Sequence, residues 1–242
     1  MDEGYLPDFL GIGAVKAGTT WLHRTLYQHP EVYLPATKPV RYFDRHIAKP
    51  IETYKAIFKP GADRLRGEFS ASYSALPLEV IHYIRDLMPG LKTIFLMREP
   101  KARAWSEARM EFSVIRGFGA KPISDADYCD FINSEQCRAR GDYLSILQNW
   151  SSVFPRNRIF TDLFEDIKTQ PNALLLRVLG FLGVSPNVDY SSYPLEKKVF
   201  EGLPVTMPER CRQLLEQMYQ TSQIRVLGDF VGMDLVGKWG YA

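Results

Sequence analysis

The sequence predicts an α/β fold, specifically a P-loop-like three-layer arrangement with a central, mostly parallel β-sheet flanked by helices. Two observations support this prediction. Short apolar runs alternate along the chain with segments of helical periodicity, which is typical of a parallel sheet covered on both faces. In addition, the apolar run 9–13 leads through a glycine-containing loop into an amphipathic segment that opens with Thr19 and Thr20. This order indicates a strand, a tight loop and a helix start.

The same alternation continues along the chain. The apolar spacing over 76–88 predicts a helix stopped by Pro89 and Gly90, and 91–97 predicts a buried strand followed by a helix with Pro100 in its first turn. The other predicted elements are a helix over 21–27, a looser surface segment over 111–130, a helix through 144–150, a helix over 171–182 closed by Gly183, and an amphipathic helix over 208–219 with Cys211 on its apolar side.

Composition narrows the class of protein. The 242 residues suit a single domain, 1–242, and 45% hydrophobic with 24% charged residues indicates a soluble globular chain. A net charge of +2 is too balanced for a nucleic-acid partner. No apolar run approaches the roughly 20 residues of a membrane span. The sequence leaves the oligomeric state open.

The number and spacing of the cysteines indicate their redox state and whether they could bind a metal. Cys129, Cys137 and Cys211 are odd in number and lack the spacing of a metal site. We therefore expect reduced thiols, a cytoplasmic location and no bound metal.

The loop between 13 and 20 indicates an anion site. From Gly13 its spacing is G-x-x-x-x-G-T-T, one residue away from the nucleoside-triphosphate loop G-x-x-x-x-G-K-[ST]. Thr19 replaces the lysine of that motif, and Lys16 supplies a lysine inside the loop instead. Unpaired N–H groups at the start of the following helix favour a bound phosphate or sulfate. The alternative is a strand-to-helix turn whose glycines serve packing only.

Two segments resemble the sulfotransferase family. Residues 16–22, Lys-Ala-Gly-Thr-Thr-Trp-Leu, are similar to the loop that binds the 5′-phosphosulfate of 3′-phosphoadenosine 5′-phosphosulfate (PAPS). Residues 98–106 match the second signature, an arginine at a strand end with a serine eight residues later. The resemblance implies that the following residues bind PAPS: Lys16, Ala17, Gly18, Thr19, Thr20 and Trp21 at the 5′ side, Arg98 and Ser106 at the 3′-phosphate, and Lys198 and Gly202 in a loop over the 3′ side. Of these, Trp21 is also expected to pack its helix.

One departure from the family pattern concerns catalysis. Residues 31–44 resemble the region in which many members carry a glutamate that takes the proton from the acceptor hydroxyl, but Pro39 stands in its place. A proline has no titratable group, so either another residue acts as the base or the protein does not catalyse the usual reaction. The candidates are Glu68 first, then Asp44 and His46.

Several residues of this region have a structural alternative. Glu68 could instead pair with Arg64, Arg66 or Lys38. Lys38 matches the family lysine beside the missing glutamate, or it is a solvated surface lysine. Glu165 and Asp166 are interpreted as a helix-start cap and not as a catalytic pair. Aromatic side chains for an acceptor cleft are Tyr42, Phe43, Tyr73 and Tyr143.

The resemblance implies in-line transfer of a sulfuryl group from PAPS to a hydroxyl or amine of a small-molecule, lipid or carbohydrate acceptor, with release of PAP and without a metal. Lys16 would stabilise the charge that develops on the leaving phosphate. Two alternatives stay open at this point. One is a non-catalytic PAPS- or PAP-binding protein, favoured by Pro39. The other is a P-loop small-molecule kinase, against which Thr19 and the strand-end Arg98 argue.

Overall fold

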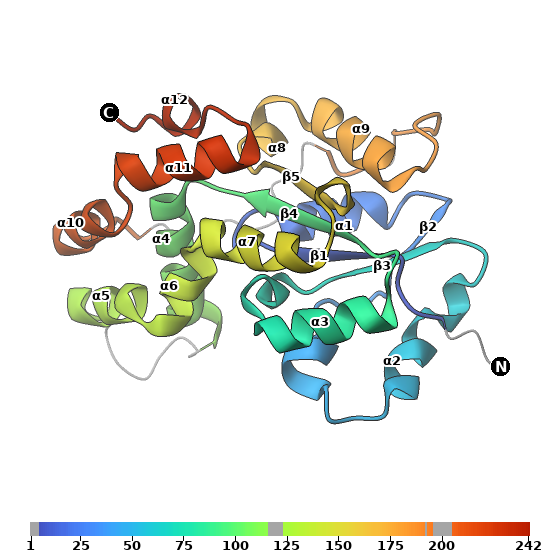
Figure 1. The fold of residues 1–242 in the computed structure, drawn as a ribbon. Coiled ribbons are helices and arrows are strands. Elements are labelled where there is room, and N and C mark those ends of the chain that lie inside the picture. Colours follow the sequence, from blue (N-terminus) through green and yellow to red (C-terminus); the bar gives the residue numbers. More distant parts are fainter. Residues whose placement is uncertain (1–4, 116–122, 192, 196–204) are drawn as a thin grey trace. The chain divides into compact units, whose positions relative to one another are not determined.

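The computed structural model describes residues 5–115, 123–191, 193–195 and 205–242 (Figure 1). The chain divides into two compact units, which are described separately. Unit 1 comprises Met1–Met97 and Gln148–Val199, and unit 2 comprises Arg98–Leu147 and Phe200–Ala242. That 1–242 act as a single domain stays a prediction.

Unit 1 is built on a five-stranded sheet with strand order β2-β3-β1-β4-β5 (Figure 1). Every pairing in it is parallel, which confirms the predicted α/β class. The strands are β1 (Phe9–Gly13), β2 (Val32–Tyr33), β3 (Leu65–Phe69), β4 (Lys92–Met97) and β5 (Ile159–Leu163).

The central strand β1 explains the apolar run that opens the sequence. All five of its residues are buried, and it pairs with β3 on one side and β4 on the other, so that Gly11 lies opposite Phe69 and Ile94. A strand buried on both faces has no need of polar alternation. Because all strands run parallel, the loops after β1, β3 and β4 leave the sheet at one edge, where ligands of such sheets bind.

The helices of unit 1 lie between the strands along the chain or, for the last two, after β5. Helix α1 contacts β3, whereas α8 and α9 contact β5. The helix predicted over 171–182 is confirmed, and Gly183 ends it with φ +83°. The helices are α1 (Thr19–Leu26), α2 (Ile51–Phe58), α3 (Leu78–Leu87), α8 (Asp166–Thr169) and α9 (Pro171–Leu182), with short turns η1 (Tyr42–His46), η2 (Lys59–Gly61), η3 (Ala71–Ala75) and η5 (Arg156–Arg158).

Unit 2 is helical in its described residues. Its elements are α4 (Pro100–Met110), η4 (Glu111–Ile115), α5 (Asp125–Asn133), α6 (Glu135–Gly141), α10 (Glu209–Met218), α11 (Thr221–Val231) and α12 (Leu235–Trp239), and α7 (Tyr143–Val153) runs across the division between the units.

The segment 111–130, expected to be a looser surface segment, contains regular helical structure at both ends. A π-turn occupies Glu111–Ile115, and α5 begins at Asp125. Ser124 and Asp127 form a capping box, in which each side chain accepts a hydrogen bond from the other residue's backbone N–H. This local signal was present in the sequence and was missed.

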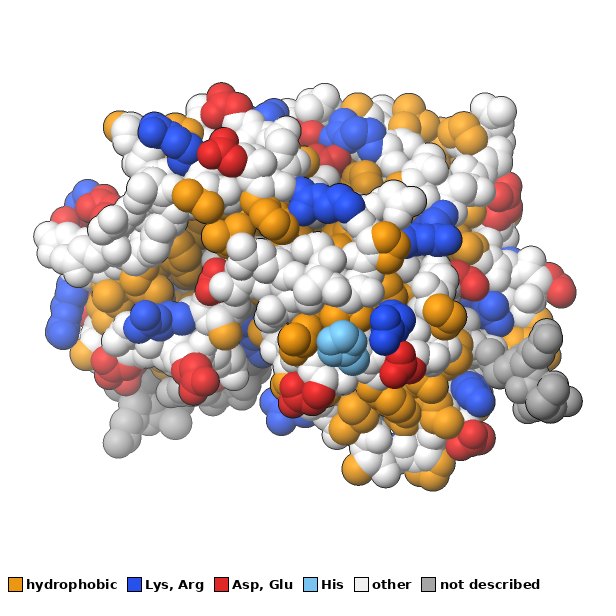
Figure 2. All heavy atoms as spheres, in the orientation of Figure 1, with side chains coloured by type: hydrophobic (Ala, Val, Ile, Leu, Met, Phe, Trp, Pro, Cys, Tyr) orange, Lys and Arg blue, Asp and Glu red, His pale blue; other side chains and the backbone are white. Residues whose placement is uncertain are grey.

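Charge is evenly spread on the face drawn in Figure 2. Basic and acidic side chains are interspersed there without a large single-sign area. This is in line with the small net charge of +2.

Candidate functional site

The loop after β1 turns sharply before α1. Lys16 and Gly18 both have left-handed backbone conformations, with φ +67° and +80°. At Gly18 a Cβ atom would lie 2.2 Å from Cδ1 of Ile167, so both the conformation and the space require glycine. The amide of Ala17 donates to the carbonyl of Ala14 (3.1 Å), which closes the turn before the chain enters α1.

The first turn of α1 presents its amide groups without a side-chain cap. Gly18 is the N-cap residue, no described side chain accepts from the first turn, and that turn holds no acidic residue. Thr19 is buried and Thr20 is exposed. This end of a helix carries partial positive charge and suits a phosphate or sulfate oxygen.

Lys38 lies at the same helix end. Its Nζ donates to Oγ1 of Thr19 (3.2 Å) and to Oγ1 of Thr20 (3.0 Å), and it sits 5.6 Å from the ring centre of Phe69. Burial, and to a lesser degree the charge of Arg24, lower the pKa of Lys38 to about 7. The interpretation as a solvated surface lysine is therefore wrong. A half-buried ammonium beside a helix N-terminus is unfavourable unless an anion joins it.

Glu68 lies at the centre of a buried hydroxyl cluster. Its carboxylate accepts from the hydroxyls of Tyr54 (2.8 Å), Tyr73 (2.9 Å) and Ser70 (2.7 Å), and the side chain is 0% exposed. Burial raises the pKa of Glu68 to about 7, although the three hydrogen bonds act in the opposite direction. The ion-pair partners expected for Glu68 lie elsewhere: Arg64 lies over the ring of Tyr33, Arg66 pairs with Asp8, and Lys38 bonds the threonines.

The same cluster holds the segment that follows Lys38. Ser70 Oγ accepts from the amide of Arg41 (3.0 Å), and Tyr73 Oη accepts from the amide of Phe43 (3.3 Å). Arg41 has φ +60° and takes part in the first bond. Glu68 thus orients two hydroxyls, and each of them fixes one amide of this segment.

Asp44 and His46, the other two candidate bases, differ in environment. Arg41 donates to Oδ2 of Asp44 through Nη2 (2.6 Å) and Nε (3.0 Å). The second oxygen, Oδ1, is buried and bonds to none of the described residues. His46 is exposed.

In unit 2, Arg98 directly follows β4 and precedes α4. The hydroxyl of Tyr143 donates to the Arg98 carbonyl (2.9 Å), and Glu99 caps α4 by accepting from the amides of Lys101 and Ala102. Ser106 lies within α4 and is 8% exposed. Arg98 and Ser106 therefore belong to the same unit. Ser106 lies in the capped helix α4, and Arg98 directly precedes the N-cap residue Glu99.

The same helix carries a buried ion-pair network. Glu107, which is 1% exposed, accepts from Arg103 at one carboxylate oxygen and from Arg140 at the other (2.5 Å). Arg103 also donates to the carbonyl of Cys137 (3.0 Å). The network ties α4 to α6.

A family model described as "Sulfotransferase domain" matches residues 6–218. The chain belongs to the sulfotransferase domain family. This match confirms the sequence-based assignment and favours it over both alternatives, the non-catalytic nucleotide-binding protein and the kinase.

Curated relatives share less than 30% of their residues with this chain over the matched part. Human bifunctional heparan sulfate N-deacetylase/N-sulfotransferase 3 is 28% identical over 206 residues, covering 77% of this chain and 23% of that protein. The membrane-associated sulfotransferase kil1 of Dictyostelium discoideum is 29% identical over 122 residues, covering 49% of this chain and 26% of that protein. The sulfotransferase domain thus spans about a quarter of the length of these relatives.

Solved structures agree on the fold. A sulfotransferase from Alicyclobacillus acidocaldarius matches with a TM-score of 0.76 at 23% identity, covering 97% of this chain and 98% of that one. Mouse sulfotransferase SULT7A1 complexed with PAP matches with a TM-score of 0.53 at 16% identity, covering 92% and 82%.

Several expectations for this sulfotransferase domain need correction or stay open. The cap interpretation of Glu165 and Asp166 is wrong, because α8 has no side-chain cap bond and Asp166 instead pairs with Arg177 (2.5 Å). The aromatic side chains considered for a cleft are all buried: Tyr42, Phe43, Tyr73 and Tyr143. Trp21 packs in the core, as expected, and its Nε1 donates to the carbonyl of Leu195 (3.1 Å). Lys198 and Gly202 lie outside the described residues.

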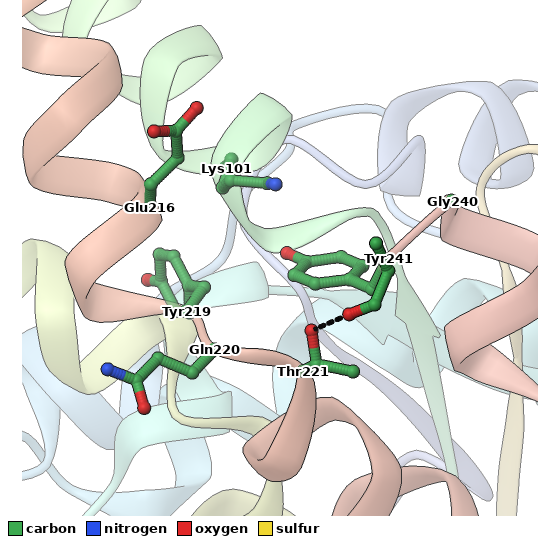
Figure 3. A pocket seen from close by; sticks show the side chains of 8 residues that line it. Lys101, Glu216, Tyr219, Gln220, Thr221, Gly240 and Tyr241 are labelled. Carbon is green, nitrogen blue, oxygen red and sulfur yellow. Dashed lines mark hydrogen bonds between the residues drawn. The ribbon is translucent and has the colours of Figure 1, made fainter.

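A pocket of about 320 Å³ lies in unit 2 near the start of α4 (Figure 3). Lys101 reaches over the ring of Tyr241, 4.2 Å from its centre, and Tyr241 donates to Glu99 (2.6 Å). None of the site residues predicted from the sequence lines it. The lining residues are Lys101, Glu216, Tyr219, Gln220, Thr221, Gly240, Tyr241 and Ala242.

The described residues contain neither a membrane-spanning helix nor a metal-binding cluster. No helix among them is long and apolar enough to cross a bilayer. No cluster of three or more His, Cys, Asp or Glu side chains suited to a metal ion occurs in that part of the chain.

Proposed function

We propose that this domain transfers the sulfuryl group of PAPS to a hydroxyl or amine of a small-molecule, lipid or carbohydrate acceptor and releases PAP. The observation that carries the proposal is the Lys38 ammonium on the hydroxyls of Thr19 and Thr20, at the uncapped start of α1. The hydroxyls of the two threonines, the lysine ammonium and the uncapped amides at the start of α1 would together hold a dianionic group.

The residues around this cradle fit the 5′-phosphosulfate. Lys16, the amides from Gly18 to Thr20 and Lys38 would hold it. PAPS supplies the activated sulfuryl group, and these donors stabilise the negative charge that develops on the leaving phosphate oxygen. Donors placed in advance for such charge contribute about 3–4 kcal/mol each in measured cases.

Arg98 and Ser106 would hold the 3′-phosphate. The guanidinium provides paired, charge-assisted hydrogen bonds, and the serine adds a hydroxyl. Tyr143 supports this role because it fixes the Arg98 carbonyl (2.9 Å). Lys198 and Gly202 stay a prediction as further residues of this side.

For the general base we now favour Asp44, while Glu68 and His46 stay candidates. Asp44 keeps one carboxylate oxygen without a described partner, and Arg41 holds the other. Oδ1 is buried as well as unpaired, so it would take the proton only of an acceptor hydroxyl that reaches this buried position. Glu68 is enclosed by three hydroxyls. Its environment supports a positioning role, in which it orients the hydroxyls that hold Arg41 and Phe43.

The names of the relatives suggest which acceptor to test first. Relatives of this chain are named heparan sulfate N-deacetylase/N-sulfotransferases, so an amine of N-deacetylated heparan sulfate is the first acceptor to test. The cytoplasmic location expected from the sequence stays a prediction, since one relative is named membrane-associated.

Calorimetric titration with PAP, AMP and ATP with magnesium tests the donor site. We expect PAP to bind in the micromolar range, AMP to bind much more weakly, and Arg98→Ala to remove most of the preference for PAP. Binding of ATP with magnesium, and not of PAP, would overturn the proposal in favour of a kinase.

A second assay tests turnover. PAP release from PAPS is followed with a panel of de-N-sulfated polysaccharides, phenols and lipid alcohols. Acceptor-dependent release supports the transferase. Tight PAP binding with no release across the panel would support the non-catalytic alternative.

A further inference from the structure

Two of the three cysteines face each other inside unit 2. Cys129 lies on α5 and Cys211 on α10, 82 residues apart, and their Sγ atoms are 2.6 Å from one another. Both side chains are buried, with exposures of 5% and 0%. The proposed sulfuryl transfer uses neither of them.

This separation is short for two independent thiols. Non-bonded heavy atoms in protein interiors prefer about 3.5–4.0 Å, whereas a disulfide bond measures about 2.05 Å. The two helices already pack against each other and bring the two sulfurs into contact. We propose that Cys129 and Cys211 form a disulfide bond that ties α5 to α10.

Cys137 provides an internal comparison. It belongs to the same hydrophobic cluster and is equally buried. Its sulfur has a different neighbour, since Nη2 of Arg103 lies 3.5 Å away. The pairing is therefore selective: of the three cysteines, Cys137 stays a free thiol.

The bond forms by thiol–disulfide exchange with a small disulfide such as oxidised glutathione. One cysteine thiolate attacks glutathione disulfide, giving a mixed disulfide and one reduced glutathione. The second cysteine attacks the mixed disulfide and releases the other glutathione. The two protein thiols lose two electrons and two protons, and one glutathione disulfide becomes two thiols.

Burial controls when this exchange happens. Burial, together with the contact to Cys129, raises the pKa of Cys211 to about 12, so the folded dithiol holds very little thiolate at neutral pH. Exchange therefore requires opening of the α5–α10 contact or takes place during folding. The state of this pair reports the redox environment in which the chain folded, and the cytoplasmic expectation of three reduced thiols becomes testable.

Thiol counting and peptide mapping test the proposal directly. The wild-type protein is equilibrated in glutathione redox buffers, both as native protein and during refolding from denaturant, so that slow access to the buried sulfurs cannot hide the bond. Free thiols are then alkylated under denaturing conditions. We expect one alkylated cysteine, Cys137, and a linked pair of peptides carrying Cys129 and Cys211. Three alkylated cysteines after oxidative refolding, or a bond to Cys137, would overturn the proposal.

Thermal unfolding adds a readout that does not depend on mapping. A bond closing a loop of this length should raise Tm by roughly 10 °C in the oxidised wild type and in Cys137→Ser. Cys129→Ser and Cys211→Ser should show no difference between oxidised and reduced samples. A redox-dependent shift that persists in either variant would exclude this pair as its source. None of these measurements depends on the sulfotransferase activity.

Discussion

Among the residues that the structure describes, each unit contains one buried glutamate, and the surroundings of the two differ. In unit 1, Glu68 is held by three neutral hydroxyls, from Tyr54, Ser70 and Tyr73. In unit 2, Glu107 is held by the guanidinium groups of Arg103 and Arg140.

The nearby cations differ in the same way. Lys38 of unit 1 donates to two hydroxyls, and its pKa is lowered to about 7 by burial and by Arg24. In unit 2, burial alone would lower the pKa of Arg103. The Glu107 carboxylate acts in the opposite direction, and the pKa of Arg103 is raised overall. In unit 2 the buried carboxylate thus pairs with guanidinium groups, whereas Lys38 meets only hydroxyls and an aromatic ring among the residues that the structure describes.

This difference separates a structural network from a binding site. A buried ion pair that is complete needs no ligand, and breaking it is costly. A cation held only by hydroxyls at a helix N-terminus gains a counter-charge when an anion binds. We therefore expect substitutions in the Glu107 network to change stability first and substitutions around Lys38 to change binding first.

The largest expected effect is the loss of stability in Glu107→Gln. The variant leaves the buried Arg103 without its counter-charge, which should lower the free energy of unfolding by about 3–5 kcal/mol. Denaturant unfolding measures it, with Glu68→Gln at pH 6 as the matched control. An equal or smaller loss in Glu107→Gln would contradict the distinction between the two glutamates.

Lys16→Ala should impair catalysis with little change in stability. Removing one donor from the phosphosulfate cradle is expected to lower kcat by about 100- to 1,000-fold. Initial rates of PAP release measure it, with Lys59→Ala as the control because Lys59 is an exposed lysine of η2. Sulfation at a near-normal rate in Lys16→Ala would remove the assigned role.

Glu68→Gln should change the pH dependence of stability. Because the pKa of Glu68 is raised from 4.5 to about 7, the folded protein holds a proton that the unfolded chain loses above pH 4.5. The resulting stabilisation is complete below about pH 4.5 and is lost as the pH rises through 7, amounting to about 3 kcal/mol.

Glutamine stays neutral, so the variant should lack this decline. The measurement is the free energy of unfolding of both proteins at several pH values between 4.5 and 8. Parallel curves for the two proteins would show that Glu68 does not titrate in this range. In Glu68→Gln, a large rise in KM relative to the wild type at pH 6 would support the positioning role of Glu68. Glutamine is close to glutamate in shape, but it cannot order the hydroxyls of Ser70 and Tyr73 in the same way.

The local parts of this picture were predictable from the sequence. Strand β1, its loop and α1 depend on apolar runs, glycines and helix-start residues that are adjacent in the chain. The end of α9 at Gly183 depends on the same kind of signal. The capping box of Ser124 and Asp127 was equally local, so the start of α5 could have been predicted.

The partners of the buried charges were not predictable in this way. Glu68 meets Tyr54 from a different element, and Glu107 meets Arg140 from 33 residues away. Periodicity shows that a face is buried, but it does not show which polar group lies opposite. Lys38 could be aligned with a family lysine, yet its contact with Thr19 and Thr20 depends on how a loop folds back over 18 or 19 residues.

The smallest expected effect concerns Lys38 and pH. With a pKa of about 7 the free protein loses this charge as the pH rises, whereas a bound phosphate keeps the ammonium protonated. Binding of PAP above pH 7 should therefore take up a proton, and the affinity should fall by about fivefold between pH 7 and pH 8. The phosphate itself contributes little here, because its second pKa is about 6. Calorimetry in two buffers of different ionisation enthalpy measures the proton uptake. Lys38→Arg keeps its charge over this range and should bind with no such uptake, so an identical pH dependence in both proteins would place the titrating group elsewhere.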